Sequence, residues 1–208
     1  MKKTILVLAV LFLSFSARAQ QRPDWDGGGI YFGNTAVLGT FYDMNDGKSN
    51  HFAIDAFGVV VPLTPTGIVD FRANLRYTYD NLFFKDPSTL VDSPAGPVAV
   101  PIVSNDFKKS KLRFHTVSAP VGFSVNPGKM SIGALIAPGL VFEGTTKYKA
   151  PKTKGKISDY NRFSLRLEGV VSYDGYGVYV NYGFQPLFEA GVYGDNARLL
   201  TFGLVLGF

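Results

Sequence analysis

The stretch from Ile68 to Asp80, IVDFRANLRYTYD, decides the fold of this chain. Apolar and polar side chains alternate along its whole length. One face carries Val69, Phe71, Ala73, Leu75, Tyr77 and Tyr79, and the other carries Asp70, Arg72, Asn74, Arg76, Thr78 and Asp80. Because successive side chains of a β-strand point to opposite faces, this pattern predicts a strand that has one face in an apolar medium and the other in a polar medium.

The same alternation recurs from Arg162 to Tyr173 and, more weakly, in six other stretches. We therefore expect eight strands. They cover 31–42, 51–61, 68–80, 112–125, 130–143, 162–173, 176–186 and 198–208.

The connections between these strands are alternately short and long. The short ones are 62–67, 126–129 and 174–175, and the long ones are 43–50, 81–111, 144–160 and 187–197. A transmembrane β-barrel has tight periplasmic turns and longer outer loops. The sequence therefore predicts an all-β fold, an eight-stranded antiparallel up-and-down transmembrane barrel.

Pairing across the short turns supports this fold, because apolar residues then face apolar residues. Asp174-Gly175 suits a two-residue hairpin turn. The expected pairs are Tyr173 with Tyr176 and Glu168 with Asn181 across this turn, Ile54 with Leu75 and Asp55 with Asn74 across residues 64–65, and Phe123 with Ile132 across Pro127-Gly128.

Aromatic residues are expected at the two membrane interfaces, where amphipathic rings prefer to lie. We place Tyr173, Tyr176 and Phe208 at the periplasmic interface. The outer interface is expected to hold Tyr42, Phe52, Tyr77, Tyr79, Phe142, Tyr182 and Phe184.

The N-terminus has the features of a secretory signal. Lys2 and Lys3 precede the apolar run Ile5–Leu13, and Ala17-Arg18-Ala19 offers a small-residue cleavage site. The run is too short for a membrane-spanning helix, which needs ~20 residues. We predict a signal peptide over 1–19, a periplasmic lead-in over 20–29 and the barrel over 30–208.

Composition excludes several kinds of protein. Cleavage would lower the formal charge from +5 by three, to +2, so the basic pI is poor evidence for a nucleic-acid partner, and we expect none. The chain has no Cys, which excludes disulfides and thiolate metal sites. We recognise no metal or cofactor motif. His115 and Ser118 fall on opposite faces of one strand, so we assign no catalytic residues.

The polar faces predict a charged lumen. Eight strands leave an interior that side chains can just fill, so we expect a cross-linked plug, with an anion pathway as the alternative. The predicted lumen network is Asp55, Asp70, Arg72, Asn74, Arg76, Arg162, Arg166, Glu168, Asn181 and Gln185.

Two outer loops are candidates for interactions. The third loop is basic, with Lys147, Lys149, Lys152, Lys154 and Lys156, and we expect it to meet lipopolysaccharide phosphates. A solvated loop without a partner is the alternative. The loop 81–111 is longer than ordinary connections and is a candidate site for a protein partner.

The last strand adds a resemblance. Phe202, Leu204, Leu206 and Phe208 form an apolar face that ends on an aromatic residue, which looks like the assembly signal of outer-membrane barrels. Residues 30–208 resemble the small outer-membrane β-barrel family of the OmpA-domain and OmpX type, often called porin-like. The resemblance implies a multi-pass barrel in the outer membrane, contact with its lipid, and recognition by the barrel-assembly machinery.

The resemblance implies location and fold far more than activity. We expect a structural or interaction role through the outer loops and no enzymatic activity. The alternatives are a narrow channel, a lipid-modifying enzyme and an accessory subunit of a secretion or uptake machine.

Overall fold

The computed structural model describes residues 24–26, 28–39, 41–93, 96–103, 107–149, 152–191 and 195–208, so the predicted signal peptide lies outside the described residues. The strands are β1 (Asp24–Asp26), β2 (Ile30–Leu38), β3 (Asn50–Pro62), β4 (Val69–Phe83), β5 (Ser88–Ser93), β6 (Gly96–Pro101), β7 (Lys109–Ser118), β8 (Val121–Val125), β9 (Met130–Lys149), β10 (Lys152–Lys156), β11 (Phe163–Tyr173), β12 (Tyr176–Gly183) and β13 (Arg198–Leu206). A search of the described residues finds no helix long and apolar enough to span a membrane.

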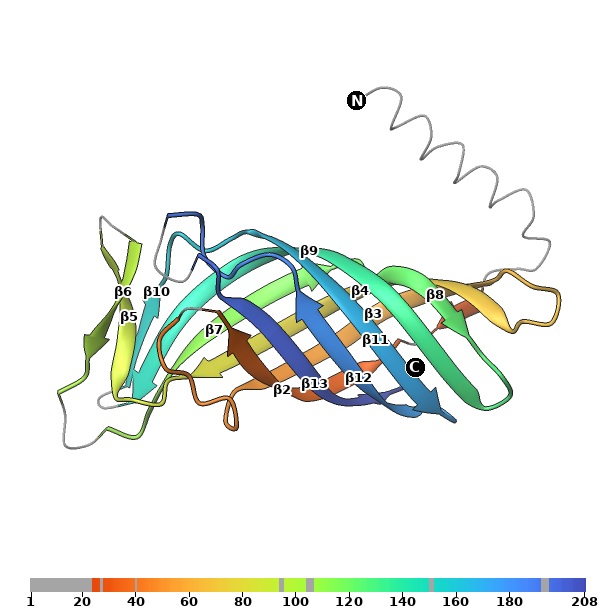
Figure 1. Ribbon diagram of the computed structural model, residues 1–208, viewed down its shortest axis with the longest axis horizontal. Helices are drawn as coiled ribbons and strands as arrows, with labels where there is room; N and C mark the ends of the chain where they lie inside the picture. The colour runs from red at the N-terminus through yellow and green to blue at the C-terminus, as the bar shows by residue number, and fades with distance from the viewer. Residues whose placement is uncertain are drawn as a thin grey trace, which may run out of the picture.

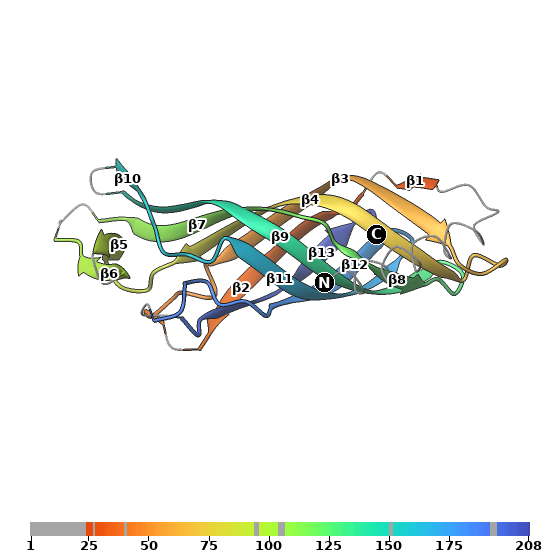
Figure 2. The same ribbon diagram turned by 90° about the horizontal axis from the view of Figure 1, so that it is seen from above.

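The described residues form a closed, eight-stranded antiparallel barrel, as predicted. Neighbours around the wall follow the chain order β2, β3, β4, β7 with β8, β9, β11, β12, β13. The barrel closes because β13 pairs with β2 along its whole length. Figures 1 and 2 show the wall in two views, with β5, β6 and β10 beyond one end. We call this end the loop end and the other the turn end.

The pairing shows how far the strands tilt. A row of directly paired residues starts at Met130 of β9, passes once around the wall, and returns to β9 at Leu140. The stagger from residue 130 to residue 140 is ten residues. In small barrels the strands tilt by ~35–45°, and eight strands enclose a lumen only wide enough for side chains.

Some strand boundaries differ from the prediction. The strand expected over 112–125 is divided into β7 and β8, because Pro120 between them has no N–H to donate to the ladder. β2 ends at Leu38, whereas β4 and β9 continue to Phe83 and Lys149. The extended strands form a sheet that continues beyond the barrel at the loop end.

The register across Asp174-Gly175 is confirmed, because Tyr173 pairs with Tyr176 and Glu168 pairs with Asn181. The predicted pairing of Phe123 with Ile132 is wrong, and Phe123 instead pairs with Ala134. The turn there takes up two more residues than expected, which moves the register without exchanging the faces.

The predicted register of the β3–β4 hairpin is also wrong. Asp55 pairs with Arg76 rather than with Asn74, and Ile54 pairs with Tyr77 rather than with Leu75. A bulge between Asp55 and Phe57 adds one residue to β3. A bulge of this kind exchanges the two faces of the strand beyond it, so Phe57 faces outward, with 50% of its surface exposed.

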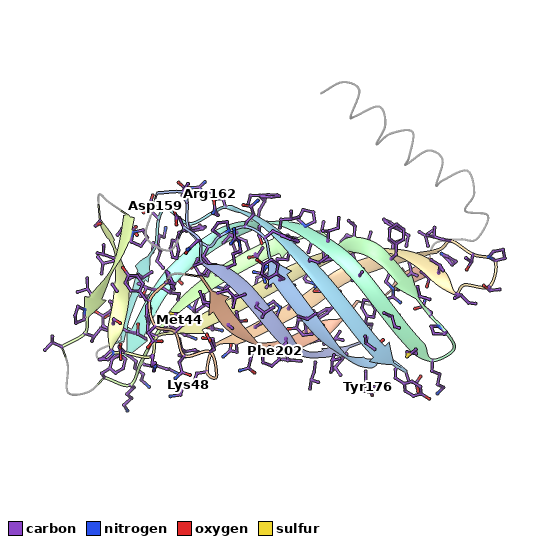
Figure 3. The ribbon with its side chains drawn as sticks, viewed as in Figure 1. Met44, Lys48, Asp159, Arg162, Tyr176 and Phe202 are labelled. Carbon is purple, nitrogen blue, oxygen red and sulfur yellow. The ribbon has the colours of Figure 1, made fainter. Side chains whose placement is uncertain are left out.

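Apolar side chains cover the outside of the wall. Phe202 is 59% exposed and its neighbour Thr201 is 0% exposed, so the two faces of β13 are sharply different. Figure 3 shows Phe202 and Tyr176 pointing away from the barrel. Tyr42, which we expected at the outer interface, instead packs inside the loop end.

An apolar core closes the loop end, and we call it the mouth cluster. It gathers residues from wall strands and from all four long connections, with Tyr42, Met44 and Tyr160 among the side chains packed around it. Its buried members are Leu82, Phe84, Leu90, Leu112, Phe114, Ile157, Phe188 and Leu199. The loop expected over 81–111 contributes to this core and includes a β5–β6 hairpin.

Candidate functional site

Arg76 of β4 holds together the central layer of the lumen. Its Nε and Nη2 donate to Asp55 on the neighbouring β3 at 2.6 and 3.1 Å. Its Nη1 donates to Glu168 Oε2 on β11, across the barrel, at 2.5 Å. The three side chains are buried, and buried charges of this kind are stable only when they are paired.

Asp55, which lies inward just before the β3 bulge, also has its carboxylate bound by other groups in this layer. Asn74 Nδ2 donates to Asp55 Oδ2 at 2.9 Å, and the Tyr31 hydroxyl and the Gly29 N–H donate to the same oxygen at 3.3 Å. The Arg76 guanidinium packs over the Tyr31 ring, and its central carbon lies 3.9 Å from the ring centre. Asp55 therefore depends on the segment that precedes β2.

We expected that segment, 20–29, to be a periplasmic lead-in, and three of its described residues form a strand beside β3. β1 pairs with Gly58–Val60 of β3. Gly28 has a φ of +74°, and a Cβ there would lie 2.5 Å from the Asp55 Cβ. Only glycine allows this backbone conformation so close to Asp55.

Replacing Gly28 by Ala should therefore destabilise the barrel. The positive φ alone costs ~1–2 kcal/mol, and the new methyl group would push Asp55 away from Arg76. Gly128→Ala is the matched control, because Gly128 has a φ of +70° and open space around it. Urea unfolding in lipid vesicles should show the larger loss for Gly28→Ala, and equal losses would contradict this view of Asp55.

A second ion pair crosses the lumen nearer the loop end. Arg166 Nη2 on β11 lies 2.6 Å from Asp80 Oδ2 on β4, and His51 Nδ1 on β3 lies 2.7 Å from Asp80 Oδ1. Asp80 is completely buried. We call these three residues the upper layer. The predicted network missed His51 and Asp80. His51 is four residues before Asp55 on the same strand, so alternation alone could have placed it on the same inner face.

A lower layer closes the turn end. Arg72 Nε donates to Ser124 Oγ at 2.9 Å, and its guanidinium lies 4.4 Å from the centre of the Phe208 ring. Asn126 Nδ2 donates to Asp70 Oδ2 at 2.6 Å. We expected Phe208 on the lipid face, and this is wrong, because β13 ends at Leu206 and Gly207, with a φ of +82°, turns the chain inward.

Most of the predicted lumen residues lie in these three layers, and two do not. Arg162 precedes β11 and Gln185 follows β12, and both side chains are exposed at the loop end. Figure 3 shows Arg162 at the loop end, away from the lumen. The two strands are shorter than predicted, so the alternation no longer applies to these positions.

The predicted basic outer loop is a β-hairpin rather than an irregular loop. β9 pairs with β10 on one side and with β7 on the other. Lys111, Lys147 and Lys154 follow one another across the three strands in a single row. Directly paired residues lie on the same face of a sheet, so these lysines share one face.

This face points outward, because the residues between its lysines on β7 are buried. Leu112 and Phe114 belong to the mouth cluster, whereas Val117, further along the outward face, is 42% exposed. We call this surface the basic face. Its members are Lys109, Lys111, Arg113, Lys147, Lys149, Lys154 and Lys156. Of Lys152, only the backbone is described, and it pairs with Lys149.

The cations of the basic face crowd one another. A hollow of about 270 Å³ is lined by Lys109, Lys111, Lys147, Tyr148 and Lys149. Partial burial lowers the pKa of Lys111, and the charges of Arg113, Lys109 and Lys147 lower this pKa further. Lys154 is paired with Glu143 at 2.8 Å.

An aromatic belt lies directly below the basic face on the same outer surface. The Tyr77 hydroxyl is 2.6 Å from His115 Nδ1, and the His115 ring centre is 4.8 Å from that of Tyr79 and 5.9 Å from that of Phe142. Such polar aromatic groups prefer the level of lipid headgroups. Ser118 lies on the opposite face, toward the lumen.

An eight-stranded barrel with an apolar outside, a filled polar lumen and short turns at one end has the architecture of small transmembrane β-barrels. Among solved structures, the chain is similar to Ail, the attachment invasion locus protein of Yersinia pestis. The two share 10% sequence identity, the match covers 90% of this chain and 98% of that chain, and the TM-score is 0.43. No family model and no curated protein sequence matches the chain.

Proposed function

We propose that this chain is an outer-membrane protein without enzymatic activity, whose loop end binds the phosphate groups of lipopolysaccharide. The observation that carries the proposal is the basic face immediately beyond the aromatic belt. Polar aromatic groups prefer the level of the headgroups, which supports a position for these lysines near the phosphates of the outer leaflet.

The orientation of the basic face favours a ligand in the membrane. The face continues the lipid-facing side of β7 and β9, so it looks sideways across the membrane surface. The row Lys111, Lys147 and Lys154 places like charges directly opposite one another. Such pairs are destabilising, and bound phosphates would relieve the repulsion.

The filled lumen favours an interaction role over a channel. Two ion pairs, Arg76–Glu168 and Arg166–Asp80, cross the barrel, and the mouth cluster lies over them. These side chains occupy the path that a solute would need. The filled lumen therefore favours the outside of the loop end as the surface for this interaction.

The β5–β6 hairpin is our candidate surface for a protein partner. Val91, Val98 and Val100 are 48%, 40% and 41% exposed there, while Leu90 of the same hairpin anchors it in the mouth cluster. A rigidly held apolar surface favours contact with another protein.

Neutralising the basic face should weaken the interaction with lipopolysaccharide. Each lysine near an anionic surface contributes ~1 kcal/mol, so the double variant Lys147→Gln/Lys154→Gln should lose about thirtyfold in affinity. Binding would be measured by native mass spectrometry of nanodiscs that contain bisphosphorylated lipid A. Lys129→Gln, a lysine at the turn end, is the matched control.

Two further arms of the experiment test the chemistry and the source of the phosphate. Dephosphorylated lipid A should bind the wild-type protein as weakly as bisphosphorylated lipid A binds the double variant. Soluble heparin should compete poorly if the site takes a membrane lipid. Equal binding of both lipid A forms would refute the proposal, and strong competition by heparin would assign the face to soluble polyanions instead.

A further inference from the structure

A small cavity lies between the upper layer and the mouth cluster. Its volume is about 30 Å³. Its lining includes the polar residues Arg166, Thr116, Ser164, Asn161 and Gln185 and the apolar residues Phe114, Val141, Leu187 and Leu199. The cavity therefore has charged and hydroxyl groups as well as hydrocarbon in its lining.

The polar part of the lining has hydrogen-bonding capacity that the described residues do not use. Arg166 Nη1 and Thr116 Oγ1 are buried and have no hydrogen-bond partner among the described residues. Arg166 is 8% exposed and Thr116 is 2% exposed. Buried polar atoms are nearly always paired, so two unpaired donors on residues that line one cavity indicate a ligand that accepts hydrogen bonds.

The cavity has an opening through the barrel wall. The β11–β12 pairing ends at Arg166 and Gly183, and one further backbone hydrogen bond, from the Phe184 N–H to the Leu165 carbonyl at 2.8 Å, joins the two segments beyond this pair. Phe163 and Gln185 line the cavity and are also exposed on the outside. Phe163 is part of the apolar outer surface. The opening beside it therefore lies at the edge of this surface that is nearer the loop end.

We propose that this cavity binds the carboxylate group of a small organic acid or of a fatty acid. One carboxylate oxygen would accept a hydrogen bond from Arg166 Nη1, and the other would accept one from the Thr116 hydroxyl. The hydrocarbon next to the carboxylate would contact Phe114, Leu187 and Leu199. A cavity needs ~10–15 Å³ to hold one water, so a cavity of about 30 Å³ admits the carboxylate and few carbons. A longer chain would leave through the opening beside Phe163.

The chemistry of the lining favours a carboxylate over water alone. Water could satisfy both polar atoms, but it would leave the apolar part of the lining without a contact. Charge-assisted bonds between a guanidinium and a carboxylate are also stronger than neutral ones. Arg166 keeps its bond to Asp80 through Nη2, so binding would not require the upper layer to open.

The test uses butyrate and decanoate labelled with ¹³C at the carboxyl group, added to the refolded protein in nanodiscs and followed by NMR. We expect a saturable shift of the carboxyl signal that decanol does not reverse. Thr116→Val keeps the shape and removes the hydroxyl, and it should weaken binding about tenfold. Arg162→Ala removes an exposed arginine nearby and should not change binding.

The two acids distinguish the sources of the carboxylate. Binding of butyrate would indicate a soluble acid, and binding of decanoate alone would indicate a fatty acid from the membrane. If Thr116→Val does not fold, Leu187→Trp should fill the cavity and abolish binding. The absence of a saturable shift, unchanged binding in a folded variant, or equal competition by decanol would each overturn the proposal.

Discussion

Replacing Arg76 by Met should cause the largest loss of stability of any single lumen substitution. It would leave Asp55 and Glu168 buried without their shared cation. Breaking a buried ion pair from one side costs ~3–5 kcal/mol, and here one substitution breaks two. Urea unfolding in lipid vesicles would measure the loss. Arg162→Met is the matched control, since Arg162 is exposed, and it should change stability by less than ~0.5 kcal/mol.

The second variant in this test restores the balance of charge. Adding Glu168→Gln to Arg76→Met removes one of the two unpaired carboxylates, so it should recover part of the lost stability. Planar-bilayer recordings should show little current for the wild-type protein and more for Arg76→Met. Large, stable wild-type channels would show that the lumen is open and would make a channel the preferred function.

Replacing Val180 by Arg should destabilise the barrel by ~2–4 kcal/mol if the wall lies in a membrane. Val180 is in the middle of β12 and faces outward, with 48% of its surface exposed. An arginine there would carry its charge into the hydrocarbon region. A soluble barrel would hardly respond, because substitutions at exposed positions usually change stability by ~0.5 kcal/mol or less.

Tyr176→Arg is the control for depth. Tyr176 lies on the same strand and face at the turn end and is 71% exposed. A charge near the interface costs only ~0–1 kcal/mol. Unfolding in vesicles should therefore separate the two variants clearly, and similar small losses at both positions would contradict a membrane-spanning wall.

The sequence predicted the wall well wherever strict alternation was present. The β11–β12 register was correct because a two-residue turn leaves no freedom in pairing. The β3–β4 register failed at the bulge, where Ala56 and Phe57 are both exposed. The adjacent apolar residues did not reveal that bulge, because Phe52-Ala53-Ile54 and Val59–Val61 of the same strand are also consecutive apolar residues and pair regularly.

The charged lumen could be predicted only in part. The alternation of each strand placed Arg76 and Glu168 on the inner face. It could not show which residues meet across the lumen, because these contacts depend on the stagger of the whole barrel. Arg162 and Gln185 were misplaced because strand ends cannot be located from alternation. The mouth cluster was missed because it joins residues of the wall strands to apolar residues of the long connections, which have no periodicity.

The mouth cluster also constrains how this protein can vary. Outer loops usually accept insertions independently, because each extends into solvent. Here Met44, Leu90, Ile157 and Phe188 come from different connections and pack into one core. An inserted peptide in one connection would disturb the other three, so natural variation and engineered tags should concentrate at the turn end. The turns around Gly67, Gly128 and Gly175, which have open space beside them, are places where the chain can be lengthened at low cost.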